Sequence, residues 1–109
     1  MDSDIDLKIS FRFLELSEGQ AFALKNDNLE ATFGTHFKTK SITGSVPLRE
    51  DNIDQVSSFI EENHISKDST DIFVSFVTEY DTRIFEVPNY VNQAVVKIGS
   101  QLVVSYSIV

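Results

Sequence analysis

The side chains that could bind a metal ion or carry a proton are few and widely spaced. The only histidines are His36 and His64, far apart in the chain. Glu61 precedes His64 by one helical turn, so a helix would place both on one face. A metal site built from such pairs needs a second pair, which the sequence lacks. We therefore expect His64 to lie near a helix C-terminus, where the helix dipole favours its charged form.

Motifs for nucleophilic catalysis and phosphate binding are also missing from the sequence. Gly44-Ser45 and Gly99-Ser100 do not form the G-x-S-x-G elbow of a hydrolase. There is no glycine-rich phosphate loop, and the acidic segment 50–54 lacks the calcium-loop pattern. Without cysteine, the chain has no disulfide, thiolate zinc site or cysteine nucleophile. The sequence thus predicts a protein that is not an enzyme and has no catalytic residue, metal or cofactor.

Carboxylates are the abundant charged group, with 17 Asp and Glu against 9 Lys and Arg and a net charge of −8. This balance argues against direct nucleic-acid binding and against anionic membranes. The acids gather between Glu50 and Asp71, where Lys67 is the only base. Such a surface keeps a protein soluble, or it steers a basic partner into place. Lys38 and Lys40 form a separate basic spot, and this segregation favours an interface.

The predicted docking face combines this acidic segment with the residues that follow it. Tyr80 is included as an aromatic anchor, because interfaces are enriched in tyrosine. The predicted partner-binding residues are Asp51, Asp54, Glu61, Glu62, Asp68, Asp71, Glu79, Tyr80 and Asp81.

With 109 residues, 41% of them hydrophobic, the chain is long enough for one domain over 1–109 and too short for two. Its acidic start differs from a secretory signal, and no apolar run is long enough to span a membrane. We therefore expect a cytoplasmic protein.

Alternating apolar residues predict a half-buried strand over 5–16, with a bulge or the strand end where the alternation slips at Leu14. Apolar residues at helical spacing predict helices over 52–64 and 89–98, the second closed by Gly99. Further strands are expected at 71–79, 83–87 and 101–108, with a hairpin turn at 80–83. The strand at 71–79 is apolar on both faces and should be central in its sheet.

Residues 17–42 leave two alternatives open. Ser17 could cap a short helix carrying Ala21, Phe22 and Leu24. Otherwise 22–25 is a strand that turns at 26–28 into a second strand with Leu29, Ala31 and Phe33 on one face. Residues 35–42 favour a strand, and 43–52 read as a loop.

The order of these elements predicts an α+β fold. It would be an antiparallel sheet with two helices on one face, ferredoxin-like in its β-α-β-β-α-β order, with residues 17–50 inserted as extra strands. If the last strand lies at the sheet edge, it could pair with a second chain and form a homodimer.

The acidic helix 52–62 and its flanks sit in a short acidic chain without cysteine or catalytic motif. In this whole-chain profile the sequence resembles bacterial immunity proteins of contact-dependent growth inhibition and polymorphic toxin systems. The resemblance implies a non-enzymatic protein that neutralises a cognate toxin domain, often a basic nuclease. The carboxylates of Asp54, Glu61, Glu62 and Asp68 would then stand in for phosphate charge.

Two other functions remain open on the sequence alone. A ferredoxin-like homodimer could enclose a small ligand or an active site, with His36, Arg83 and Tyr90 as its polar groups. A structural subunit could assemble through its sheet edge alone.

Overall fold

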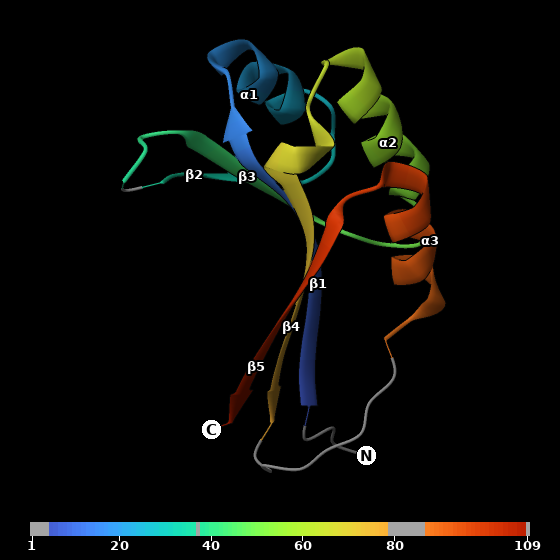
Figure 1. The fold of residues 1–109 in the computed structure, drawn as a ribbon. Helices are drawn as coiled ribbons and strands as arrows, with labels where there is room; N and C mark the ends of the chain where they lie inside the picture. Colours follow the sequence, from blue (N-terminus) through green and yellow to red (C-terminus); the bar gives the residue numbers. More distant parts are fainter. Residues whose placement is uncertain (1–4, 37, 79–86, 109) are drawn as a thin grey trace.

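The structure is a computed structural model that describes residues 5–36, 38–78 and 87–108. Its strands are β1 (Ile5–Leu16), β2 (Thr32–Thr35), β3 (Ile42–Pro47), β4 (Thr70–Thr78) and β5 (Gln101–Ile108). Its helices are α1 (Glu18–Lys25), α2 (Ile53–Glu62) and α3 (Asn89–Ile98), with a short 3₁₀ turn, η1 (Lys67–Ser69), before β4. The α+β class is therefore confirmed (Figure 1).

The strands form one five-stranded sheet in the order β2-β3-β1-β4-β5. The β2–β3, β3–β1 and β1–β4 pairs are antiparallel, whereas β4 and β5 are parallel. The prediction of a purely antiparallel sheet was therefore wrong. Helix α3 lies between β4 and β5 in the chain, and a crossover helix returns the chain to the same end of the sheet.

The alternation in β1 works as predicted. Phe11 and Phe13 are fully buried on one face, while Arg12 lies on the other. The pairing of β1 with β3 shifts its register between Phe13 and Leu16. Of the two alternatives at Leu14, this irregularity agrees with the bulge and not with the strand end, because β1 continues to Leu16, which returns to the buried face.

The helix alternative for the segment after β1 is confirmed, because Ser17 caps α1. The loop prediction for 43–52 was wrong over its first half, which belongs to β3. Gly44 lies in β3 at the point where Leu24 of α1 packs against the strand, and a Cβ atom at this position would lie only 3.0 Å from Leu24 Cδ2. The glycine thus lets α1 pack closely on β3.

The strand predicted over 35–42 was also wrong, because this segment is mostly the connection between β2 and β3.

The core lies between one face of the sheet and the helices. Phe59 of α2 packs edge-on against Phe13, with ring centroids 5.7 Å apart. Leu24 of α1, and Val91 and Ala94 of α3, join the same buried cluster. All three helices therefore pack on the same face of the sheet, whereas two were predicted there. In the part of the chain that the structure describes, no helix covers the other face.

A ferredoxin-like order is not confirmed. The segment predicted as an insertion supplies β3, which pairs directly with β1 inside the sheet. The predicted hairpin at 80–83 and the strand from 83 lie outside the described residues, apart from Val87. Among the helices that the structure describes, none is long and apolar enough to cross a membrane.

Candidate binding surface at the acidic end

Helix α2 positions two of the predicted partner-binding residues at its C-terminal end. Ile53, Val56 and Phe59 are buried along one side of this helix, so the side chains between them point to solvent. Glu61 and Glu62 follow in the last turn and are exposed. Their carboxylates lie at the negative end of the helix dipole, where further negative charge is unfavourable. They are placed at a cost to the helix, which makes them candidates for a role outside folding.

A hydrogen bond joins the C-terminus of α2 to the start of α1. The Nε2 of Gln20 donates to the backbone oxygen of Asn63 at 3.0 Å. In the same side chain, Oε1 accepts from the Ser17 N–H at 2.9 Å, and the Ser17 Oγ accepts from the Gln20 N–H. This capping box fixes Gln20, so the first turn of α1 is held against the end of α2. Glu18, exposed in that turn, is thereby brought to the same end of the molecule.

A shallow hollow of about 400 Å³ lies beside the start of α1. It is lined by residues from β1, α1, η1 and the connections around them: Glu15, Leu16, Ser17, Gln20, Ser41, Ser66 and Ser69. Several of its hydroxyl groups are already engaged, because Ser66 Oγ accepts from the Asp68 N–H and Ser69 Oγ donates to Ser66 O. Glu15, which is exposed, is the charged residue of this lining.

The turn η1 adds Asp68 to this end. Asp68 is exposed, while its neighbour Lys67 turns away toward the C-terminus of α3. The Lys67 Nζ would lie 4.0 Å from a Cβ atom at Gly99, the residue that caps the C-terminus of α3. An ammonium group near a helix C-terminus complements the helix dipole.

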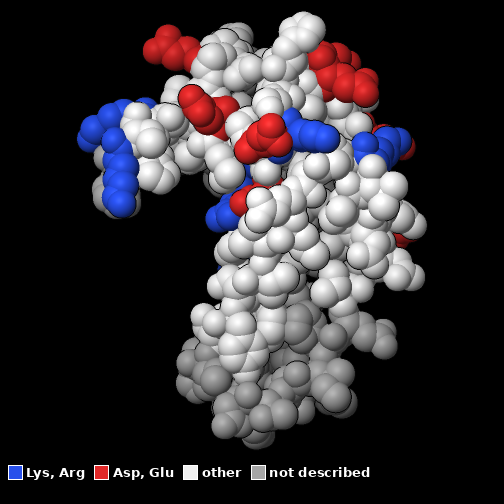
Figure 2. All heavy atoms as spheres, in the orientation of Figure 1, with Lys and Arg blue, Asp and Glu red and all other residues white. Residues whose placement is uncertain are grey.

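We call this region the acidic end, defined by its exposed carboxylates Glu15, Glu18, Glu61, Glu62 and Asp68. Figure 2 shows separate groups of Asp and Glu side chains over this end, around α1, the end of α2 and η1, with Lys or Arg atoms beside one of them. Within the described residues, no Lys or Arg lies at ion-pair distance from any of the five. Lys38 and Lys40 lie well apart, at the tip of the β2–β3 hairpin.

Two other predicted residues lie at the opposite end of α2 and are paired. Asp54 forms an ion pair with Lys97 of α3. The Oδ1 of Asp51 lies 3.5 Å from the Nε of Arg49. The Nη1 of Arg49 also lies 2.9 Å from the Oε2 of Glu30. The hydrogen bond with Glu30, and then its charge, raise the pKa of Arg49 above its usual value. These surface pairs partly compensate the charge at the start of α2, where Arg49 and Lys97 face three carboxylates. The predicted acidic face is therefore divided between two ends of one helix.

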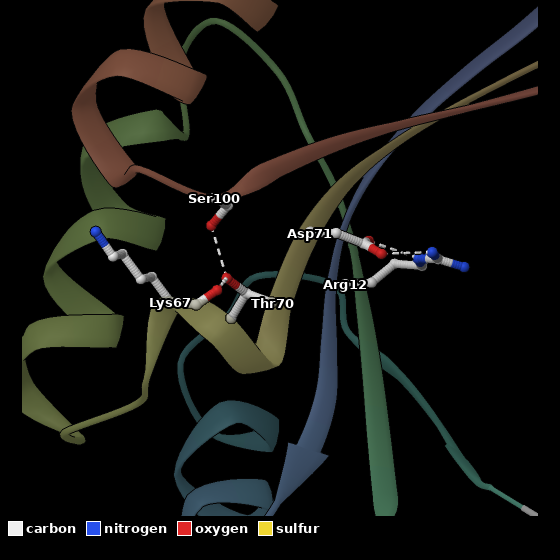
Figure 3. A network of polar contacts seen from close by, with 5 residues as sticks. All are labelled: Arg12, Lys67, Thr70, Asp71 and Ser100. Carbon is white, nitrogen blue, oxygen red and sulfur yellow. Dashed lines mark hydrogen bonds and ion pairs between the residues drawn. The ribbon is translucent and has the colours of Figure 1, made fainter.

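Asp71 differs from the other predicted residues, since it is only 4% exposed. The Nε of Arg12 donates to its Oδ1 at 2.7 Å, and Nη2 donates to its Oδ2 at 2.5 Å. Figure 3 shows this pair on one side of β4 and the bonded hydroxyls of Thr70 and Ser100 on the other. Asp71 therefore links β4 to β1, and both of its carboxylate oxygens are bonded to Arg12.

Glu79, Tyr80 and Asp81, the remaining predicted residues, lie outside the described part of the chain. Arg83, proposed for a small-ligand site, lies there too. His36 belongs to the β2–β3 connection and Tyr90 to the start of α3, on opposite sides of the molecule (Figure 1). The structure does not bring these two side chains into one site.

Burial, and then the charge of Glu50, raise the pKa of Tyr90.

The sequence predicts no metal site, although Glu61 and His64 are spaced by about one helical turn. His64 follows the C-terminus of α2 and is exposed, with a backbone φ of 54°. Over residues 5–36, 38–78 and 87–108, no three His, Asp or Glu side chains cluster in a way that could hold a metal ion.

Sequence reasoning missed Glu15 and Glu18 as members of the acidic surface. They are distant from α2 in the chain, and tertiary contacts such as the Gln20–Asn63 bond and the packing of Phe59 on Phe13 bring them close. The S-x-x-Q pattern at Ser17 and Gln20 was the available signal, since it marks where a helix begins. It does not say which helix lies beside it.

Comparison with known proteins finds no family model, no curated protein and no solved structure that matches this chain.

Proposed function

We propose that this chain is a non-enzymatic binding protein that docks its acidic end on a cationic protein. In the manner of the immunity proteins that its sequence resembles, it would cover a basic toxin domain, such as a nuclease, and thereby neutralise it. Of the nine residues predicted from the sequence, Glu61, Glu62 and Asp68 belong to this docking surface, and Glu15 and Glu18 join them.

One observation carries the proposal: five exposed carboxylates meet at the acidic end, and no described Lys or Arg pairs with them. Elsewhere the described acids are partly compensated, as Asp51, Asp54 and Asp71 show. An uncompensated cluster produces a local negative potential that steers a basic partner and speeds its association. Its alternative role, keeping the protein soluble, requires no such gathering at one end.

Paired charge variants test this assignment. Glu61→Gln with Glu62→Gln removes two charges from the acidic end, and Asp51→Asn with Asp54→Asn removes two from the other end of the same helix. Each tagged variant is used to recover partners from the cells that make the protein, at low and at high salt. We expect a basic protein in stoichiometric amount, lost at high salt and depleted by the first variant only.

The recovered partner is then produced alone, and its association rate and activity are measured with each variant. We expect the acidic-end variant to slow association about tenfold at low salt, because steering by charge acts mainly on the association rate. The wild-type chain should also inhibit the partner's activity. Equal association rates for the two double variants would remove the acidic end from the interface.

A further inference from the structure

Strand β5 forms an outer edge of the sheet. It pairs with β4 along its whole length, from Asp71↔Gln101 to Thr78↔Ile108. Among the residues that the structure describes, no strand pairs with its other side. In Figure 1 the red arrow of β5 accordingly forms the free margin of the sheet. Its outward backbone N–H and C=O groups are a ready template for one more strand.

This edge lacks the features that keep sheet edges from pairing. Proteins protect such edges with charged side chains, proline, bulges or very short strands. Strand β5 has eight residues, no charged residue and no proline, and its register with β4 is continuous. The opposite edge, β2, is only four residues long. The two edges are therefore built differently, and β5 is the one open to pairing.

The side chains of β5 present an apolar row beside the free edge. Leu102, Val104 and Tyr106 alternate along the strand, so they share one face of the sheet. They are 40%, 52% and 42% exposed. This is the face that the helices cover elsewhere, but α3 buries its own Val91 and Ala94 farther inside. The apolar row is thus left in contact with solvent.

We propose that the partner of this edge is β5 of a second copy of the chain, paired antiparallel about a two-fold axis. With the axis at Val104, Leu102 of each copy faces Tyr106 of the other, and the two Val104 side chains face each other. This register gives an unbroken row of apolar cross-strand pairs, the unit of sheet stabilisation. The result is a continuous ten-stranded sheet with a self-complementary interface.

The distribution of charge favours the antiparallel orientation of the two copies. Two chains with a net charge of −8 repel each other, and β5, which has no charged residue, adds no repulsion at the contact itself. Strand β5 also begins beside the acidic end, where Ser100 bonds to Thr70. Antiparallel pairing therefore sends the two acidic ends to opposite ends of the shared sheet. Parallel pairing would bring them together.

Sedimentation of the whole chain over a wide concentration range tests the proposal. We expect a reversible dimer in the wild type and at least about tenfold weaker dimerisation in Val104→Lys, because like charges directly opposite destabilise a strand pair. Val96→Lys is the matched control: it adds the same charge at an 85%-exposed position on α3 and should dimerise as the wild type does. A monomer at every concentration, or an unaffected dimer in Val104→Lys, would overturn the proposal.

Backbone amide exchange in the wild type gives a second readout that needs no variant. Protection of amides in 101–108 should rise with protein concentration, while protection elsewhere in the sheet stays constant. A concentration-dependent change confined to another element would assign the dimer to a different surface and refute the β5 interface.

Salt separates this proposal from the proposed function. Screening weakens repulsion between the two acidic copies, so dimerisation should persist or strengthen at high salt. Docking of the acidic end on a cationic partner should weaken under the same conditions. Either inference can therefore fail while the other stands.

Discussion

Arg12 and Asp71 form a two-pronged ion pair across the β1–β4 junction, and the same guanidinium group lies 4.0 Å above the ring of Phe73. Residue Asp71 is buried, whereas the Arg12 side chain is 33% exposed. The pair lies on the sheet face that no described helix covers. One arginine therefore neutralises a buried charge and shields an aromatic ring that would otherwise meet water.

Removing either partner of this pair should destabilise the fold, and the two losses should not be additive. Breaking a buried pair leaves an uncompensated charge, and because Arg12 is partly exposed we expect Arg12→Ala to cost about 2–3 kcal/mol, near the low end for such pairs. Asp71→Ala should cost a similar amount, and the double variant should cost less than the sum. Urea unfolding of the four proteins measures the coupling. Strictly additive losses would show that the two side chains act independently.

Gly44 should be the least tolerant glycine in the sheet. A Cβ atom there would lie 3.0 Å from Leu24 Cδ2 and 3.2 Å from Leu16 Cδ1. We expect Gly44→Ala to destabilise the fold by about 1–3 kcal/mol, as overpacking in a core does. Gly34→Ala is the control, because Gly34 is exposed and its added Cβ would meet only the Thr43 hydroxyl at 3.2 Å. Thermal unfolding compares the two, and an equal loss at both positions would contradict the packing argument.

The capping box at Ser17 should stabilise the acidic end as well as α1. Ser17→Ala removes the acceptor for the Gln20 N–H and should cost about 1 kcal/mol. Gln20→Ala should cost at least as much, because it also breaks the bond to Asn63. Ser58→Ala, at an exposed position inside α2, should be neutral or slightly stabilising. Amide exchange in α1 should quicken in the Ser17→Ala and Gln20→Ala variants. Unchanged exchange would argue that the capping box does not stabilise this end of the molecule.

Tyr90 should make the fold sensitive to alkaline pH. Burial raises its pKa above the usual value of 10.0, so the folded state holds the phenolic proton more tightly than the unfolded state. This contribution to stability is fully present below the unfolded pKa, and it is lost as pH rises from there through the folded pKa.

Comparing wild type with Tyr90→Phe isolates that contribution. The wild type should lose more unfolding free energy than the variant between about pH 8.5 and about pH 10.5, where an unfolded tyrosine ionises. Denaturant midpoints are measured for both proteins at both pH values. The difference between the two losses isolates Tyr90, because the other titrating groups contribute equally to both proteins. Parallel losses in both proteins would remove Tyr90 as the cause.

The elements with strong local periodicity could be predicted from the sequence. The expected helix at 89–98 matches α3, and the slip at Leu14 marked a real bulge. In these segments the apolar pattern and the end signals agree, with Gly99 at φ 80° closing α3. Local chemistry alone decides such elements.

Sheet order and the binding surface depend on contacts that local patterns do not encode. Nothing in β5 alone says whether it runs parallel or antiparallel to β4. Likewise Asp71 and Asp68 look alike in sequence, and only the pairing of β1 with β4 gives Asp71 its counter-ion. Prediction therefore found where the acids lie in the chain but did not distinguish structural carboxylates from free ones.

The central place of β1 has a consequence for how the chain folds as it is made. Its neighbour β3 follows after one short helix and hairpin, but Arg12 and Asp71 are 59 positions apart. While the ribosome is still adding α2, the β4 side of β1 has no neighbour and Arg12 has no counter-ion. The β4 side of the sheet therefore cannot form until β4 has emerged, and a long loop must then close. Among the described strands of this sheet, β1 waits longest for its second neighbour.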